Sequence, residues 1–225
     1  MKKAFLNWSG GKDSAFALYK ARKSGEYEVK YLFTTVYEGK VPMHNVSVDL
    51  LQRQAEQIGI PLRLFPMEKY TDAQAYGEAM ARQMEFFCRE GIDTALFGDI
   101  WLQDVRERRM QKLQNSGISA AFPLWEMRGD EVLREFFDAG FRSVVTNIDG
   151  DVLERGAVGR ELREIVSLLP KTADICGEKG EYHSFVFDGP IFRSSVTYTL
   201  QGVERREFAD ERTKRPHVYF YANLI

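Results

Sequence analysis

The feature that most constrains the fold is a regular alternation of short apolar segments and longer amphipathic segments over the first 120 residues. Apolar residues dominate the short segments, which we expect to form strands, and they recur at helical spacing in the longer ones. The expected strands cover residues 4–8, 29–37, 62–65 and 94–97, and the expected helices cover residues 14–23, 46–58, 72–90 and 104–115. Strands separated by single helices form βαβ units, so the pattern predicts an open parallel sheet with flanking helices, an α/β fold.

The pattern changes after residue 120. The next expected elements are a short strand-like segment at 121–127, helices at 130–139 and 160–168, and a strand at 141–148. Towards the C-terminus, residues 195–208 and 217–224 alternate with period two, which predicts an antiparallel pair of strands. We therefore expect an α/β domain at residues 1–120 and a smaller α+β region at residues 121–225.

A glycine-containing hexapeptide lies between the first expected strand and the first expected helix. Its residues are Ser9, Gly10, Gly11, Lys12, Asp13 and Ser14. Such a turn lies at the carboxyl edge of a parallel sheet, where open α/β folds bind their ligands. The two glycines allow a tight turn, and the start of the helix directs free N–H groups and a positive dipole to the same place. With two hydroxyls and a lysine added, the loop predicts a phosphate or pyrophosphate site.

Two common nucleotide-binding loops do not match this stretch. The pattern G-x-x-x-x-G-K-[ST] would need glycine at Leu6 and serine or threonine at Asp13, and the hexapeptide also lacks the spacing of G-x-G-x-x-G. It resembles instead the S-G-G-x-D-S loop of the ATP pyrophosphatases, which split ATP between the α and β phosphates and form adenylates. Beside a triphosphate, Asp13 is suited to hold Mg²⁺ or to cap the helix that begins there.

A second dense cluster of polar residues lies in DICGEKGEYHSFVFDGPIF at residues 174–192. Glu178, Glu181 and His183 fall within six positions on a stretch interrupted by glycines. Carboxylates can hold a metal or accept protons from an amine, and a histidine can transfer protons. We therefore take these three residues, with the lysine and aspartate of the first loop, as candidate catalytic residues. The same composition also suits a solvated loop that enters a strand.

The first loop and the late GEKGEYHSF together resemble the diphthine–ammonia ligase family and its bacterial ATP-binding relatives. The segments MHNVSVDLLQRQAEQIGIPL, ALFGDIWLQDVRERRMQKLQNSGI and FPLWEM are also similar to that family, so the resemblance covers nearly the whole chain. It implies a HUP-type α/β domain that binds ATP and Mg²⁺, and a C-terminal region whose G-E-x-G-E-[YF]-H-T motif lies at the substrate end of the cleft. Ser184 replaces the threonine of that motif and keeps the hydroxyl.

The resemblance also implies a reaction, in which ATP is cleaved to AMP and pyrophosphate, a carboxylate is adenylated, and ammonia or an amine displaces AMP. The acceptor would be a small molecule or protein that bears a carboxylate. The stretch WLQDVRERR stands where many of these ligases have Tyr-Gln-Arg, and with PMHNV it is closer to the bacterial branch, so diphthine itself is not implied. Two alternatives stay open: nucleotide binding without turnover, and sulfur transfer to tRNA, which calls for paired cysteines and a basic RNA surface.

Other candidate residues follow the expected strands. Gly98 and Asp99 end the fourth strand, at the edge that faces the nucleotide in the family fold. Asp99 is a candidate Mg²⁺ ligand together with Asp13, or a helix cap. His44 follows the second strand, near where such folds lodge adenine, and is expected to contact the base or the incoming substrate. Cys88 falls in the apolar pattern of the third helix and is expected in the core.

Composition limits the compartment and the partners. The 225 residues are 44% hydrophobic and 28% charged, as is typical of a globular protein. A net charge of −2 does not indicate a charge-based grip on nucleic acid. The two cysteines form no C-x-x-C pair, and no apolar stretch approaches the roughly 18 residues of a membrane span. We expect a cytoplasmic protein without membrane contact and leave a homo-oligomer open.

Overall fold

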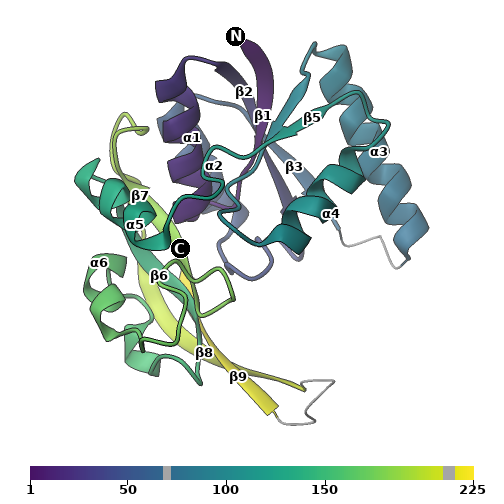
Figure 1. Cartoon of the computed structure of the whole chain (residues 1–225). Coiled ribbons are helices and arrows are strands. Elements are labelled where there is room, and N and C mark those ends of the chain that lie inside the picture. The colour runs from purple at the N-terminus through teal and green to yellow at the C-terminus, as the bar shows by residue number, and fades with distance from the viewer. Residues whose placement is uncertain (68–71, 210–215) are drawn as a thin grey trace.

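The computed structural model describes residues 1–67, 72–209 and 216–225, and it contains two sheets (Figure 1). The first sheet has five strands in the order β3-β2-β1-β4-β5, and all its neighbouring strands are parallel. Its strands are β1 (Lys2–Asn7), β2 (Tyr27–Val36), β3 (Leu62–Pro66), β4 (Thr94–Leu96) and β5 (Ser119–Ala121). The predicted open parallel sheet is therefore confirmed.

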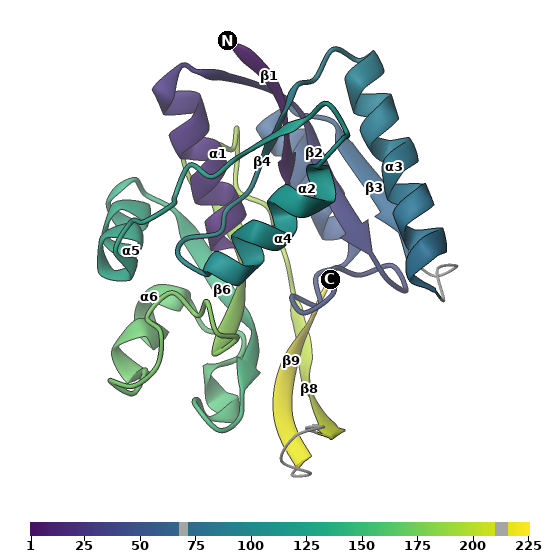
Figure 2. The ribbon, with the colours of Figure 1, turned by 45° about the vertical axis from the view of Figure 1, so that its right-hand side comes forward.

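Helices cover both faces of this sheet. They are α1 (Lys12–Ser24), α2 (Val48–Ile58), α3 (Ala73–Arg89) and α4 (Gln103–Leu113). The first two lie on one face and the last two on the other (Figure 1 and Figure 2). Each face has its own buried apolar cluster, with Phe16 and Leu51 in one and Phe87 and Leu113 in the other. The helical spacing of apolar residues thus predicted all four helices to within a few residues.

The second sheet is antiparallel, with the strand order β7-β6-β9-β8. Its strands are β6 (Arg142–Asp149), β7 (Tyr182–Asp188), β8 (Leu200–Ala209) and β9 (Pro216–Leu224). Helix α5 (Gly129–Asp138) precedes the sheet, and η1 (Arg155–Ala157), α6 (Leu162–Ile165) and η2 (Val166–Leu168) separate β6 from β7. The predicted antiparallel pairing of the last two strands is confirmed, and these strands project from the rest of the molecule (Figure 2).

Two local predictions are wrong. The segment 121–127 is mostly turn, because the strand of this region is β5 and ends at Ala121. The helix expected at 160–168 begins at Leu162 and continues from α6 directly into the 3₁₀ turn η2. Cys88 is exposed instead of buried, because its neighbour Phe87 occupies the core-facing position of α3. The expected boundary after residue 120 falls within β5.

The two sheets meet at the first loop. The Val186 N–H of β7 donates to the Gly10 carbonyl at 2.9 Å, and the Lys12 N–H donates to Ser184 Oγ at 3.2 Å. Apolar residues from both sides of this junction belong to one buried cluster, which includes Leu18 of α1 and Phe185 of β7. The loop between β1 and α1 is therefore enclosed by both sheets. Within the described ranges, no helix is long and apolar enough to cross a membrane.

Candidate functional site

The loop between β1 and α1 is built on two glycines that pack too closely for a side chain. Gly10 has φ +79°, and a Cβ there would lie 2.8 Å from both Gln54 Oε1 and a Leu51 methyl. A Cβ on Gly11 would lie 2.7 Å from His44 Cε1 and 2.9 Å from the Ser184 carbonyl oxygen. These glycines are therefore required by the packing of α2, the His44 loop and β7 around the turn, in addition to any ligand.

The start of α1 supplies hydrogen-bond donors to the cleft. The N-cap residue is Gly11, which offers no side-chain acceptor to the first turn. The Gly11 N–H donates to Ser9 Oγ at 3.2 Å, and the hydroxyls of Ser9 and Ser14 lie 3.2 Å apart. The Lys12 N–H already donates to Ser184 Oγ, but a helix N-terminus whose N-cap residue offers no acceptor, flanked by two hydroxyls, is a suitable anion site.

Lys12 is a buried cation at the centre of this loop. Its side chain is 4% exposed, and its Nζ lies 2.7 and 2.8 Å from the two carboxylate oxygens of Asp13. Burial by itself would lower the pKa of the ammonium, but Asp13 and Tyr182 more than offset it, so the pKa lies above its ordinary value. Lys12 is therefore charged at neutral pH and can exchange Asp13 for a phosphate oxygen.

Three carboxylates converge beside the lysine. Burial, and then the nearby charges of Asp13 and Asp99, raise the pKa of Glu178 to about 7. Glu178 Oε2 accepts a hydrogen bond from the Ile100 N–H at 3.2 Å, which holds the carboxyl against the end of β4. Carboxylates that repel one another in a cleft suit a divalent cation, because its charge removes the repulsion.

The carboxylates leave room for ligands other than protein. Among the described residues, three side chains of types that bind metals have their ligand atoms within 4.8 Å of one another. They are Asp149, Asp151 and His217, which lie outside the cleft. Mg²⁺ usually binds through one or two carboxylates together with phosphates and water. Asp13 and Asp99 line the same cleft and would fit that mode, in which phosphate oxygens complete the coordination.

Two imidazoles from distant parts of the chain lie together against the loop between β1 and α1. The rings of His44 and His183 are 4.6 Å apart, and His44 Nδ1 lies 3.2 Å from the Ser184 carbonyl oxygen. Burial, followed by the Lys12 charge, lowers the pKa of His44 to about 4 despite its contact with Ser184. Burial, His44 and Lys12 lower the pKa of His183 well below its ordinary value. Both rings are therefore neutral at pH 7.

Glu181 lies behind the cleft, although it belongs to the same sequence motif. It is 6% exposed, and its two carboxylate oxygens accept hydrogen bonds from the backbone N–H groups of Asp174 and Lys179 at 2.7 and 3.0 Å. The side chain thus closes the loop that carries Glu178. Its position differs from the expectation of a side chain directed at substrate, because the turns at Gly177 and Gly180 direct this carboxylate to the loop backbone.

These elements enclose a cavity of about 230 Å³. The predicted site residues that line it are Ser9, Lys12, Asp13, Ser14, His44, Gly98, Asp99 and His183. The other lining residues are Cys176, Gly177, Tyr182 and Ser184, which lie in or beside the second motif, and Asn7 and Arg109, which were not foreseen. Asn7 ends the first strand and could have been found from that position alone. Arg109 lies on a charged helix face, and nothing in the local sequence distinguishes it from its neighbours.

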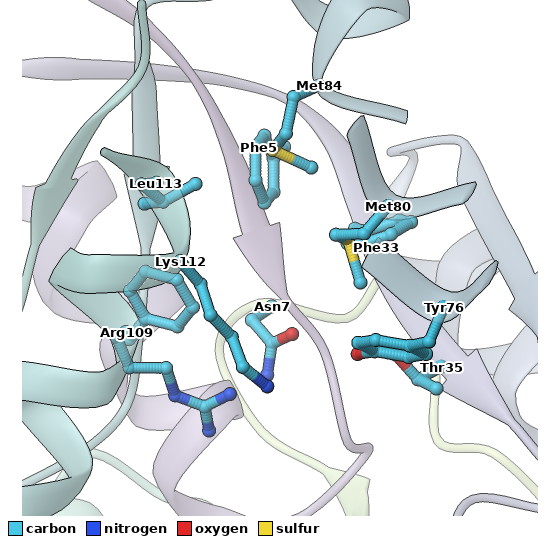
Figure 3. Close-up of a pocket in the computed structure, with 11 residues that line it drawn as sticks. Phe5, Asn7, Phe33, Thr35, Tyr76, Met80, Met84, Arg109, Lys112 and Leu113 are labelled. Carbon is cyan, nitrogen blue, oxygen red and sulfur yellow. The ribbon is translucent and has the colours of Figure 1, made fainter. Parts of the chain in front are cut away.

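A second, narrower cavity adjoins the first on the α3 and α4 side of the sheet. It measures about 70 Å³ and shares Asn7 and Arg109 with the larger cleft. Figure 3 shows Arg109 and Lys112 on one side of Asn7, with Tyr76 and Thr35 on the other. The remaining lining residues are apolar, namely Phe5, Phe33, Met80, Met84, Phe97 and Leu113. The site thus combines a polar cleft with an aromatic and sulfur-lined extension.

Two family models match the chain. The diphthamide synthase N-terminal domain matches residues 1–119, and the diphthamide synthase C-terminal domain matches residues 128–212. The first range contains the loop between β1 and α1, and the second contains the motif with Glu178 and His183.

The chain belongs to the diphthamide synthase family. Among solved structures, it is similar to one described as a predicted subunit of tRNA methyltransferase from Methanocaldococcus jannaschii. That match has 14% sequence identity and a TM-score of 0.38, and it covers 74% of this chain and 87% of the other. No curated protein matches the chain.

Membership of the diphthamide synthase family makes the chain an enzyme of the PP-loop class, whose members use ATP. The loop at residues 9–14 contacts Ser184 and Val186, so the regions matched by the two family models meet at this loop.

Proposed function

We propose that the protein is an ATP-dependent amide ligase that releases AMP and pyrophosphate. In this reaction a carboxylate of the acceptor is adenylated by ATP, and ammonia or an amine then displaces AMP. The observation that supports it most is the single cleft in which Lys12 and the hydroxyls of Ser9 and Ser14 lie together with the carboxylates of Asp13 and Asp99 and two neutral imidazoles. The first set of groups suits phosphates, and the second suits a cation and a proton-accepting step.

The phosphates of ATP would lie against the loop between β1 and α1. The backbone N–H groups at the start of α1, the hydroxyls of Ser9 and Ser14, and the Lys12 ammonium would bind the pyrophosphate portion. Asp13 and Asp99 would hold Mg²⁺, which neutralises phosphate oxygens when bound. Binding of phosphate to Lys12 would release Asp13 from its ion pair with the lysine. Asp13 would then be available to bind Mg²⁺.

The base of the nucleotide would enter the narrow cavity beside the cleft. Its aromatic and methionine lining suits a planar ring, and flexible methionines adjust to the shape of a guest. Arg109 lies at the junction of the two cavities, with its Nε 3.4 Å from Asp99 Oδ2, and would contact the phosphate nearest the nucleoside. His44 lies beside His183 and does not line the narrow cavity, so we assign it to the acceptor and not to the base.

We call the loop between β1 and α1, residues 9–14, the phosphate cradle. The acceptor would occupy the part of the cleft beside this cradle and the two histidines. Its carboxylate oxygen would attack the α-phosphorus, and the bond to the leaving pyrophosphate would break with its electron pair on the pyrophosphate oxygen. His183 Nε2 has no hydrogen-bond partner among the described atoms, so it is free to accept a proton from the attacking nitrogen in the second step. Glu181 would act as a positioning residue, through the loop that carries Glu178.

The proposal is tested by removing the charge of Lys12 while keeping its length. Lys12→Met should weaken binding of Mg·ATP about 10- to 100-fold, because a hydrogen bond to a charged group contributes ~1.5–3 kcal/mol. Lys20→Met is the matched control on the same helix, where the lysine is half-buried and pairs with Glu135. Calorimetry would measure the affinities, and AMP release with candidate carboxylates would measure turnover. Equal affinity in Lys12→Met and Lys20→Met would exclude the cradle as the phosphate site.

A further inference from the structure

Several buried polar atoms next to the cleft lack hydrogen-bond partners among the described residues. They include both amide atoms of Asn147, which is 1% exposed, and Nε2 of His183. The Tyr221 hydroxyl interacts with the Asn147 amide, yet neither amide atom makes a hydrogen bond of ordinary geometry. Buried polar groups nearly always have a partner, and an ordered water or small polar ligand supplies it where protein atoms do not.

These side chains form a row across the antiparallel sheet. Asn147 of β6 pairs with His183 of β7 on one side and with Tyr221 of β9 on the other. Directly paired residues of antiparallel strands have their side chains on the same face, about 5 Å apart. A β-bulge between Val145 and Asn147 sets this register. Bulges redirect side chains beside functional sites, and here the bulge aligns Asn147 with His183. We call His183, Asn147 and Tyr221 the polar row.

The polar row has a cavity at each end. His183 lines the phosphate cleft, and Tyr221 lines a separate outer opening of about 420 Å³. The loop that follows β2 also contacts both cavities. His44 lines the cleft, and the next residue, Asn45, lines the outer opening. The His44 ring contacts the His183 ring at a tilt of 43°, and Asn45 Nδ2 donates to the Ala222 carbonyl of β9 at 2.9 Å. The loop is thus fastened over the row at both ends.

We propose that the polar row is the route by which ammonia, or an amine of similar size, enters the cleft from the outer opening. This inference rests on the proposed ligase function and adds an entry path for its nitrogen donor. ATP and the acceptor would fill the cleft from its open side, so the nucleophile needs access through another wall. The amide and imidazole atoms of the row would hydrogen-bond a small polar guest, and the loop above it excludes larger ones.

The row ends at the point where the second step would take place. The ammonia nitrogen would form a bond to the carbonyl carbon of the acyl adenylate. The bond from that carbon to the AMP oxygen would break, and the electron pair would leave with AMP. The proton released from nitrogen would pass to His183 Nε2, which is the row's last group on the cleft side.

The first test is structural and uses a variant of the middle residue. Asn147→Leu is close in volume and removes both polar atoms. Thr146→Val is the matched control, because Thr146 is also 1% exposed with an unpartnered hydroxyl but pairs with no member of the row. In high-resolution crystals we expect ordered solvent bonded to Asn147 and His183 in the wild type and in Thr146→Val, and its loss in Asn147→Leu. A dry row in the wild type would overturn the proposal.

The second test is kinetic. AMP release would be followed with ammonium chloride as the nucleophile and a dialysed cell extract as the source of acceptor. Asn147→Leu should raise the KM for ammonium at least 10-fold and leave the KM for ATP within about 2-fold, whereas Thr146→Val should change neither. An unchanged KM for ammonium in Asn147→Leu would refute the proposed route and leave the ligase proposal standing. Absence of AMP release from the wild type would remove the ligase proposal, and the route with it.

Discussion

At the scale of single residues, ionised carboxylates in and beside the cleft repel one another and so lower the stability of the folded protein in the absence of a cation. Glu178 is the clearest case, because burial and then Asp13 and Asp99 raise its pKa from 4.5 to about 7. A carboxyl whose pKa is higher in the folded state binds its proton more tightly there than in the unfolded chain. Its contribution to stability is therefore complete below about pH 4.5 and is lost as the pH rises through 7.

The raised pKa of Glu178 predicts how the stability of the protein depends on pH. The melting temperature of the wild type should fall relative to that of Glu178→Gln between about pH 5 and pH 7.5, because only the wild type must ionise this carboxyl. Mg²⁺ with ATP should reduce the difference at the upper end, because the cation offsets the repulsion. Scanning calorimetry over the pH range would measure it, with Glu107→Gln, exposed on α4, as the control. Parallel curves for the wild type and Glu178→Gln would show that Glu178 does not titrate in this window.

At the scale of elements, the site depends on the close approach of β4 to the start of α1. A Cβ on Gly98 would lie 2.8 Å from the carbonyl carbon of Asp13 and 2.9 Å from its oxygen. Both are backbone atoms of the first turn of α1, so they cannot move aside without moving the phosphate cradle. The glycine that follows β4 is therefore set by the packing of two elements more than 80 residues apart in sequence, and not by its own backbone angles.

Two glycine-to-alanine substitutions should consequently have opposite effects. Gly98→Ala should destabilise the protein by about 1–3 kcal/mol through overpacking and should weaken ATP binding as the first turn of α1 shifts. Gly77→Ala lies within α3, where a Cβ would meet nothing within 4 Å, and should stabilise by up to about 1 kcal/mol through helix propensity. Urea denaturation and calorimetry would measure both. Equal stability of the two variants would contradict the packing argument.

At the scale of the whole molecule, the two sheets share one apolar core. Phe16 of α1 is fully buried and packs edge-on against Phe136 of α5 and Phe141, which precedes β6. The same buried cluster extends from β1 to β9. The α1 side of the parallel sheet is therefore buried only because residues after position 120 pack against it.

This continuity predicts cooperative unfolding. The full chain should unfold in one transition, with coincident midpoints by circular dichroism and by tryptophan fluorescence, because neither sheet retains its core without the other. A fragment of residues 1–120 should show no cooperative transition or should aggregate, because Phe16 and its neighbours on α1 would face water. Two separate transitions in the full chain, or a stable fragment, would contradict the prediction.

Local sequence patterns determined most of the fold of this protein. The spacing of apolar residues follows from the periods of helix and strand, which is why the parallel sheet, its four helices and the last antiparallel pair could be predicted. The hexapeptide at residues 9–14 could be placed as well, because a loop that follows a parallel strand always lies at the carboxyl edge. The family could be recognised because its two motifs are contiguous in sequence.

Only the tertiary structure decided which side chains face one another. Glu178 and Glu181 are three positions apart in one motif, yet one lies beside Asp13 while the other binds the backbone of its own loop. His44 and His183 are in contact although they lie 139 positions apart, and no local period predicts such a pair. The direction of a loop side chain depends on contacts between distant segments, whereas periodicity reports only on neighbours in sequence. The strands and the glycine loop at residues 9–14 could therefore be predicted from the sequence, while the cleft, its pair of imidazoles and the polar row exist only once the two sheets are packed together.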